Sequence, residues 1–430
     1  MIVRKNILLP RVVFIIVTVV FFCSGCRDAS DEKDTKPSGR WHTLMQSEGN
    51  GDPDDEMYEK LIGLGYLQGH DKASGSSGII VHAEKHTDNT LNLCVSGHAP
   101  SAYIMDMNGD ILHRWIYKKA TKIWPDLSEK NSDISYWRRA HLFPNGDLLA
   151  IYEGIGMIKV DKDSNLIWAS RSNKKAHHDL EVNDNGTIYV LTREWKQLPE
   201  ISQKRVMDEY ITLVAPDGTE VKHFSLIDMI AKSEYRSLLE RKIVRNGGFY
   251  GHILHANTIE VLEGLKGTSS GLFRRGNVLV SILMLDLVCV FDLEKQIMVW
   301  AMGGGMWAKQ HQPTLLPGGH MLLFDNKYVN GKQSRVIEFD PFTQEILWQY
   351  GNKPEEQFYS ETCGSCQRLP NGNTLITVTD SGEAQEVTDK GKIVWHYINP
   401  HRAGAEQELI ASLFEVVRIN RQDYPFLQAP

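Results

Sequence analysis

The chain has 430 residues, a mild formal net charge of −7, and apolar and charged fractions of 42% and 23% that are ordinary for a globular protein. The sequence contains no basic stripe or run of lysine and arginine, which excludes nucleic acid as an expected partner. At roughly 150 residues per domain the length suggests two or three domains, although β-sheet architectures often form one longer unit.

The first 26 residues predict an export signal. Arg4 and Lys5 precede an apolar run from Val12 to Phe22, and the segment CSGC ends at Cys26. A basic start, a short apolar core and small residues at the end are typical of a secretory signal. Ser-Gly-Cys resembles a bacterial lipobox with Cys26 as the lipidated residue; an uncleaved signal anchor is the alternative. Both interpretations predict an exported, membrane-tethered protein, and we expect a bacterial lipoprotein facing the periplasm or the cell exterior.

Residues 27–80 predict a flexible tether between the lipid and the folded domain. Residues 27 to about 53 are polar and rich in Asp, Lys, Ser and Gly, a composition that buries little apolar surface. Residues 54–68 (DDEMYEKLIGLGYLQ) carry a short amphipathic helix, and a second polar stretch, 69–78, leads into the domain expected over residues 81–430.

Beyond the tether, one unit repeats along the chain. One half is an apolar strand that follows a turn glycine, with copies at Gly146, Gly186, Gly276, Gly319 and Gly372. The other half is a strand, a turn and a strand closing on an aromatic residue, with copies ending at Trp115, Trp168, Phe224, Trp300, Trp348 and Trp395. Units of about 40–50 residues with four strands each are typical of propeller blades, which stack around an axis. Six closing hairpins therefore predict an all-β, six-bladed β-propeller.

Two segments depart from the repeat. The first blade lacks its own leading strand, which either Leu91–Ser96 or the C-terminal Ser412–Ile419 would supply. Residues 225–245 lack strand alternation and have helical spacing, which predicts a short helical insertion near the axis.

Equivalent positions in the blades carry basic side chains. Counting back eight residues from four of the turn glycines gives Arg138, His178, His311 and Gly364. In the blade with the long insertion, His255 in HANTIEV matches His178 in HDLEV. Since innermost strands line the central channel, these positions converge. Asn257 shares the face of His255 by strand periodicity, so we expect it to bind substrate together with Arg138. In a regular strand His177 and Asp179 point the other way and are expected to be scaffold residues.

A cluster of histidines with an arginine suits an anionic group. Histidine can act there as nucleophile, general acid or proton donor because its pKa lies near ambient pH. Each histidine could instead hydrogen-bond within its own blade, and three could hold a metal ion. No carboxylate shares this register and Arg138 opposes a cation, so we expect neither a metal nor another cofactor.

The cysteines outside the signal form two groups. Cys94 and Cys289 lie in strand-like runs and are expected to be buried core thiols. Cys363 and Cys366 form a C-x-x-C without the βαβ setting of a redox motif, so a local disulfide or two idle thiols is expected.

The repeats and the histidine segments together resemble the bacterial arylsulfotransferase family over roughly residues 90–425. The motifs that carry the resemblance are AYIMDMNGDILHRW, HHDLEVNDNGTIYVLT, HANTIEVL, QHQPTLLPGGHMLLFDN, SRVIEFDP and RLPNGNTLI with VTDKGKIVWHYINP. The resemblance implies a six-bladed propeller that moves a sulfuryl group from a phenolic sulfate ester to a phenol without a nucleotide donor. It also implies a ping-pong route in which His311 becomes sulfated, while His178 and His255 hold the sulfate and help the phenolate leave.

The sequence departs from the family pattern at two positions. Leu283 stands where the family usually has an arginine after the His255 strand, and Glu383 stands where an arginine follows Ser-Gly. One lost charged donor typically costs about 2.7–4 kcal/mol in the transition state, which Arg138 could offset.

These departures favour an alternative, a catalytically inactive propeller that binds a sulfated or anionic ligand such as a polysaccharide or a partner protein. A quinone-cofactor propeller is disfavoured, because six blades are predicted where those enzymes generally need eight and an axial Ca²⁺ with carboxylate ligands. The sequence leaves open the donor, the acceptor and whether the chain forms a homodimer.

Overall fold

The computed structural model describes residues 68–127, 134–202, 205–239, 251–265, 271–404 and 406–427. The expected signal with Cys26, the tether up to residue 67 and the end of the helical insertion lie outside these ranges. Within them, no helix has the length and apolar character needed to cross a membrane.

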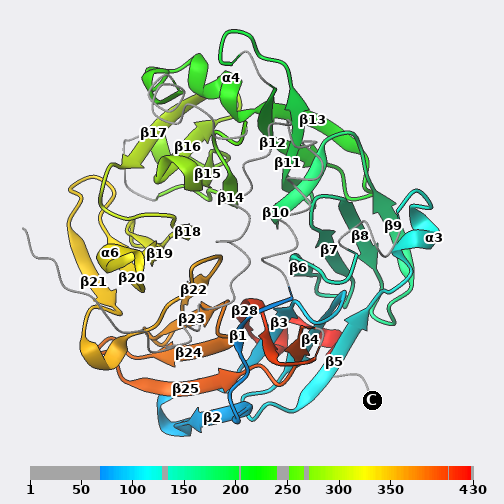
Figure 1. Cartoon of the computed structure of the whole chain (residues 1–430), viewed down its shortest axis with the longest axis vertical. Coiled ribbons are helices and arrows are strands. Elements are labelled where there is room, and N and C mark those ends of the chain that lie inside the picture. The colour runs from blue at the N-terminus through cyan, green and yellow to red at the C-terminus, as the bar shows by residue number, and fades with distance from the viewer. Residues whose placement is uncertain are drawn as a thin grey trace, which may run out of the picture.

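The described residues form an all-β structure in which antiparallel sheets of four or five strands surround a central axis, in the manner of a β-propeller (Figure 1). Two sheets contain β6 (Arg139–Leu142), β7 (Leu148–Tyr152), β8 (Gly156–Val160) and β9 (Leu166–Ser170), and β10 (Lys175–Val182), β11 (Ile188–Lys196), β12 (Val206–Val214) and β13 (Glu220–Ser225). Two more contain β14 (Ala256–Val261), β15 (Val278–Ile282), β16 (Leu287–Asp292) and β17 (Ile297–Gly303), and β18 (His311–Leu315), β19 (Met321–Lys327), β20 (Gln333–Phe339) and β21 (Ile346–Tyr350).

The two remaining large sheets join the ends of the described chain. One has the order β28 (Leu413–Ile419), β3 (Leu91–Ser96), β4 (Ser101–Met105) and β5 (Ile111–Ile116). Both segments that the sequence offers for ring closure therefore lie in this sheet, with β28 innermost and β3 beside it. The other has the order β2 (Gly78–His82), β25 (Ile393–Ile398), β24 (Glu383–Val387), β23 (Thr374–Val378) and β22 (Ser365–Arg368).

A small three-stranded sheet contains β1 (Gly69–Lys72), β27 (Leu409–Ala411) and β26 (Arg402–Ala403). The strands β1 and β2 come from the range that the sequence predicts as a tether, yet they pair with β27 and β25 of the folded domain. The last part of that range is thus built into the sheets.

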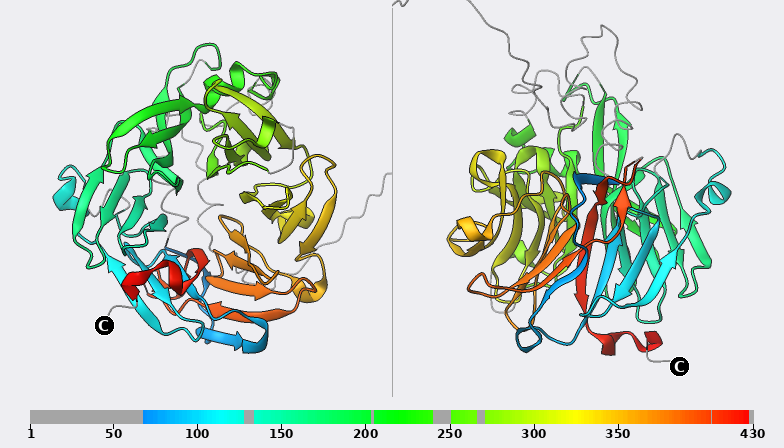
Figure 2. Two further views of the ribbon diagram at one scale, coloured as in Figure 1. Left: turned by 180° about the vertical axis from the view of Figure 1, so that it is seen from behind. Right: turned by 60° about the horizontal axis from the view of Figure 1, so that its bottom comes forward.

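The helical segments within the described residues are short. They are η1 (Glu84–His86), α3 (Ala120–Ile123), α4 (Leu226–Ala231), η2 (Gly271–Phe273), η3 (Leu283–Leu285), α6 (Tyr328–Gly331), η4 (Pro354–Glu356), η5 (Arg421–Asp423) and η6 (Pro425–Leu427). Figure 2 shows η5 and η6 at one face of the ring, after β28. Helix α4 begins the predicted insertion; the Ser225 hydroxyl accepts the Asp228 amide as an N-cap, and four apolar side chains of α4 are buried.

The closing tryptophans explain how neighbouring sheets are joined. The indole N–H of Trp115 donates to the carbonyl of Gly146 at 2.9 Å, and Trp168 donates to Pro216 at 3.0 Å. Each acceptor lies in a turn of the next sheet, and Trp395 closes the circle through a 3.0 Å bond to Met107. A buried indole needs such a partner for its N–H, so this repeated residue joins one sheet to the next.

Side-chain carboxylates join the innermost strands near the axis. Asp179 on β10 accepts the amide of Ile259 on β14 at 3.0 Å. Glu260 on β14 accepts the amide of Leu315 on β18 at 3.0 Å. The innermost strands are therefore held at fixed heights relative to one another, which positions the residues at their leading ends.

Candidate active site

Irregular backbone within or just before three innermost strands positions the predicted histidines. His178 and His255 have left-handed φ values of 57° and 55°, which few non-glycine residues adopt. The ladders of β10, β14 and β18 also shift register next to His178, His255 and His311. Since a bulge redirects the side chains around it, each of the three histidines lies where its own sheet departs from regular strand geometry.

The structure brings His178, His255, His311 and Arg138 together. The imidazole rings of His178 and His255 are 4.8 Å apart and nearly perpendicular. The charge of Arg138 acts on both His178 and His311, and His311 is among the groups that act on His178 and His255. We call His178, His255 and His311 the histidine cluster.

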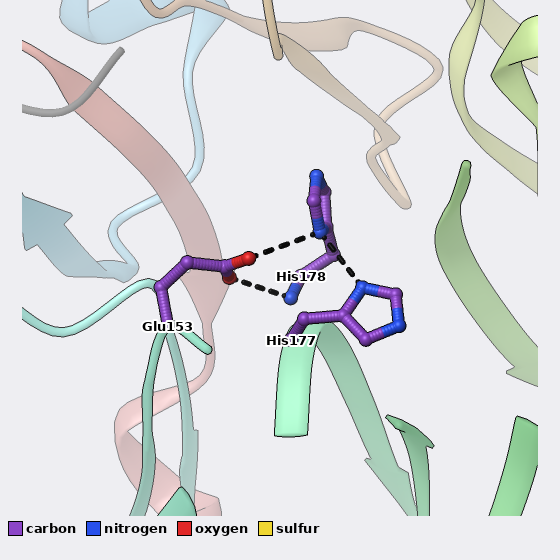
Figure 3. Close-up of side chains that lie close together, drawn as sticks. All are labelled: Glu153, His177 and His178. Carbon is purple, nitrogen blue, oxygen red and sulfur yellow. Dashed lines mark hydrogen bonds and ion pairs between the residues drawn. The ribbon is translucent and has the colours of Figure 1, made fainter. Parts of the chain in front are cut away.

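Glu153 is a member of the site that the sequence does not predict. One carboxylate oxygen accepts the backbone N–H of His178 at 2.7 Å, and the other lies 3.3 Å from His178 Nδ1 (Figure 3). The prediction that His177 points away from His178 is wrong, because their Nδ1 atoms are 2.9 Å apart. The left-handed backbone at His178 breaks the strand alternation on which that prediction depended.

Arg193 on β11 is the second missed residue. Its guanidinium lies 3.6 Å from the Glu153 carboxylate, and its charge acts on His177, His178 and His255. Strand β11 pairs with β10, where Arg193 lies opposite Lys175. The sequence does not show which residues of β10 and β11 lie opposite each other, and without that register the position of Arg193 near the site could not be predicted.

Arg138 is held by contacts on both sides. Its guanidinium donates to the Cys363 thiol at 3.3 Å and lies 5.0 Å from the centre of the Phe414 ring. Cys363 precedes Gly364, the glycine of the predicted register. Both Cys363 and Cys366 are buried free thiols, and Cys94 and Cys289 are buried as predicted.

A family model for arylsulfotransferase (ASST) matches residues 127–400, which include every predicted residue of the cluster and Arg138. This chain belongs to the arylsulfotransferase family. No curated protein matches it.

Among solved structures, a protein of unknown function from Bacteroides caccae is 12% identical, with a TM-score of 0.51 over 77% of this chain and 99% of that chain. The Cps50 (Swd1) β-propeller domain of Myceliophteria thermophila is 11% identical, with a TM-score of 0.44 over 81% and 99%. A streptogramin B lyase is 11% identical, with a TM-score of 0.43 over 81% and 96%. At such identities the likeness concerns the fold alone.

Leu283, where the family resemblance implies an arginine, lies beside the cluster. The amide of Leu283 donates to the carbonyl of His255 at 3.0 Å. The Leu283 carbonyl accepts the ammonium of Lys309 at 3.2 Å, and that ammonium also pairs with Asp286. The second departure, Glu383, pairs with His396 at 3.0 Å.

Asn257 has structural contacts in this arylsulfotransferase-family chain. Its amide donates to the carbonyl of Gln310 at 2.9 Å, just before His311, and its oxygen accepts the hydroxyl of Thr258. It thus ties the β14 strand to the residue that precedes the β18 histidine.

Burial makes the histidine cluster neutral. It is the largest cause lowering the pKa of His178 and His255 well below the usual value, and it lowers the pKa of His311 to about 4. The sequence suggests a cluster that is easily protonated, whereas the positive charge that acts on the cluster comes from Arg138, Arg139 and Arg193.

Glu153, His177 and His178 offer ligand atoms that all lie within 4.8 Å of one another, which is close enough to hold a metal ion. Arg193 pairs with the same carboxylate at 3.6 Å. Its positive charge opposes a cation at this place.

The low pKa of His311 predicts an acid-dependent loss of stability. The unfolded chain takes up this proton at the ordinary value of 6.5 and the folded protein only near 4, so stability falls as the pH drops between these values. At pH 4 the loss from His311 is about 3 kcal/mol. Raised carboxyl pKa values, such as that of Glu181 at about 7, act in the opposite sense.

Urea unfolding of wild type and His311→Gln at pH 7 and pH 4 separates the contribution of His311 from that of the other groups. The free energy of unfolding should fall further in wild type than in His311→Gln between pH 7 and pH 4. An equal fall in both proteins would contradict the prediction.

Proposed function

We propose that this chain is an exported aryl-sulfate sulfotransferase, a six-bladed propeller that transfers a sulfuryl group from a phenolic sulfate ester to a phenol through His311. One observation carries the proposal. Three neutral histidines from three sheets meet beside Arg138 and Arg193 in a chain of the arylsulfotransferase family.

The first half-reaction uses a ring nitrogen of His311 as nucleophile. Its lone pair forms an N–S bond while the bond between sulfur and the phenolic oxygen breaks, and the phenolate leaves with the electron pair. Neutral imidazole is competent for this attack, and burial keeps His311 neutral. The guanidinium groups of Arg138 and Arg193 stabilise the sulfuryl oxygens in transit.

The second half-reaction returns the enzyme to its starting state. The acceptor phenol attacks sulfur, the N–S bond breaks, and the phenolic proton passes to a base. His178 and His255 are neutral and adjacent, so either can accept this proton and deliver it to solvent. Glu153 contacts both the backbone and the ring of His178 and orients it.

Membrane attachment is part of the proposal. Lipidation of Cys26 would anchor the chain, and the polar residues that follow would let the propeller reach small phenolic substrates in the periplasm or outside the cell. The site does not call for a cofactor.

The test is to incubate the detergent-solubilised full-length protein with 4-nitrophenyl sulfate and watch for nitrophenolate, with and without phenol. Release that requires phenol, together with formation of phenyl sulfate, is the expected result. No release with several phenolic acceptors would overturn the proposal.

One observation favours a second candidate, a catalytically inactive propeller that binds a sulfated or anionic ligand. Leu283 replaces the arginine that the family pattern places beside His255. Titration with inorganic sulfate separates the two: affinity without turnover of 4-nitrophenyl sulfate is the signature of the binding protein.

A further inference from the structure

We propose that Asn326 is a positioning residue that holds His311 in the tautomer with hydrogen on Nδ1, so that Nε2 is the nitrogen that accepts the sulfuryl group. The tautomer follows from contacts among protein groups, whereas its use in catalysis rests on the proposed function.

The amide of Asn326 can be oriented without ambiguity. Asn326 is fully buried on β19, the strand that pairs with β18 of His311. Its amide nitrogen lies 3.0 Å from the carbonyl of Ser360 and 2.6 Å from that of Cys363. Two carbonyl oxygens can only accept, so they require the NH₂ group on their side. The amide oxygen of Asn326 therefore faces His311.

The contacts of His311 then fix where its hydrogen lies. Nδ1 is 2.8 Å from the amide oxygen of Asn326 and 3.1 Å from the backbone carbonyl of Lys309. Both partners are acceptors, so Nδ1 must be the donor. Because burial keeps the imidazole neutral, it carries a single hydrogen, and the lone pair is on Nε2.

An amide partner suits a nucleophile that must be neutral before the reaction and positive during it. As the Nε2–S bond forms and the S–O bond to the phenol breaks, positive charge develops on the ring and the Nδ1 hydrogen becomes a stronger donor. The oxygens of Asn326 and Lys309 stabilise that charge without a full negative charge. A carboxylate in place of Asn326 would favour protonation of the resting ring and remove the Nε2 lone pair.

Ser334 offers a matched control. Its hydroxyl donates to the backbone carbonyl of Asn326 at 2.9 Å and accepts the amide of Ser360 at 3.1 Å. Ser334→Ala therefore disturbs the same buried segment without removing the contact to His311.

The first measurement is of the tautomer. Full-length protein labelled with ¹⁵N-histidine gives nitrogen shifts that distinguish protonated from unprotonated ring nitrogens, and His311→Gln identifies the signals of His311. We expect a protonated Nδ1 and an unprotonated Nε2 in wild type and in Ser334→Ala. In Asn326→Leu the Nε2-protonated form should gain population, and in Asn326→Asp the ring should titrate at a higher pH.

The second measurement is kinetic, on the same variants with 4-nitrophenyl sulfate and phenol. Asn326→Leu should lower kcat roughly 10- to 100-fold, the usual effect of losing one hydrogen bond to a charged group, with KM little changed. Asn326→Asp should move the acid limb of the pH profile upward, and Ser334→Ala should match wild type.

The outcomes distinguish failure of the Asn326 inference from failure of the proposed sulfotransferase function. Wild type with hydrogen on Nε2, or unchanged nitrogen shifts in Asn326→Leu, would overturn the inference whatever the activity. An active wild type whose Asn326→Leu variant keeps the wild-type rate would also overturn it. The expected tautomer in a protein without turnover would leave the inference on His311 standing and remove the proposed function. Wild type and Asn326→Asp still decide the question if Asn326→Leu does not fold.

Discussion

Replacing His311 with alanine is expected to abolish sulfuryl transfer, lowering kcat/KM by at least about 10³-fold. The substitution removes the atom that forms the bond to sulfur, and two of the neighbouring groups are poor replacements. The pKa of the Cys363 thiol is raised by burial, and His178 is held by His177 and Glu153. The measurement is nitrophenolate release from 4-nitrophenyl sulfate in the presence of phenol.

The control for this substitution is His320→Ala. His320 lies in the turn between β18 and β19, in the same sheet as His311, and pairs with Glu338 at 2.9 Å on the exterior. The control should keep the wild-type rate. With ³⁵S-labelled 4-nitrophenyl sulfate and no acceptor, wild type should carry label on the peptide that contains His311. Label on another residue, or turnover by His311→Ala, would contradict the assignment.

The register argument found the cluster because innermost strands of a repeated unit occupy equivalent places around an axis. His178 and His311 precede their turn glycines by the same eight residues, and the hydrogen bonds between innermost strands keep such positions at matched heights. Arg138 follows the same rule from the segment just before β6.

The same argument failed where the backbone leaves regular strand geometry. Alternation places His177 on the far side of its strand, but the left-handed backbone at His178 brings the two rings into contact. Histidine gives no sequence signal for a positive φ, as glycine often does. Glu153 and Arg193 were missed because they lie outside the repeated register and reach the site only through strand pairing and ion pairs.

Two other results depended on tertiary structure. The polar segment of β1 (GHDK) and the short segment of β2 (GIIVH) show no alternation that predicts a strand. They become strands because β27 and β25 offer edges with which to pair. The ordinary pKa of histidine predicts a cluster that takes up protons near neutral pH. In the folded protein burial lowers the pKa of all three histidines, so they stay neutral.

The second large effect is expected from Arg193→Ala, which should lower kcat/KM about 10²- to 10³-fold and weaken the binding of inorganic sulfate. The proposed transition state spreads negative charge over the sulfuryl oxygens, and one lost charged donor typically costs about 2.7–4 kcal/mol. The family resemblance implies such a donor at the position of Leu283. Here Arg193 lies in the same sheet as His178, acts on both His178 and His255, and is a candidate substitute for that donor.

The reciprocal change tests this interpretation. Adding Leu283→Arg to the Arg193→Ala variant should raise kcat/KM at least tenfold above that of Arg193→Ala alone. The reason is that Leu283 lies next to His255, to which its backbone is hydrogen-bonded. Arg205→Ala is the matched control: Arg205 contacts the carbonyl of Trp195 at 3.3 Å and should leave kcat/KM unchanged. If Arg193→Ala keeps both its sulfate affinity and its rate, then the missing charge is supplied elsewhere. Arg138 and Arg139 both act on the nucleophile His311 and on His178. Because Arg139 is already paired with two carboxylates, those of Asp179 and Glu415, Arg138 is the next guanidinium to replace.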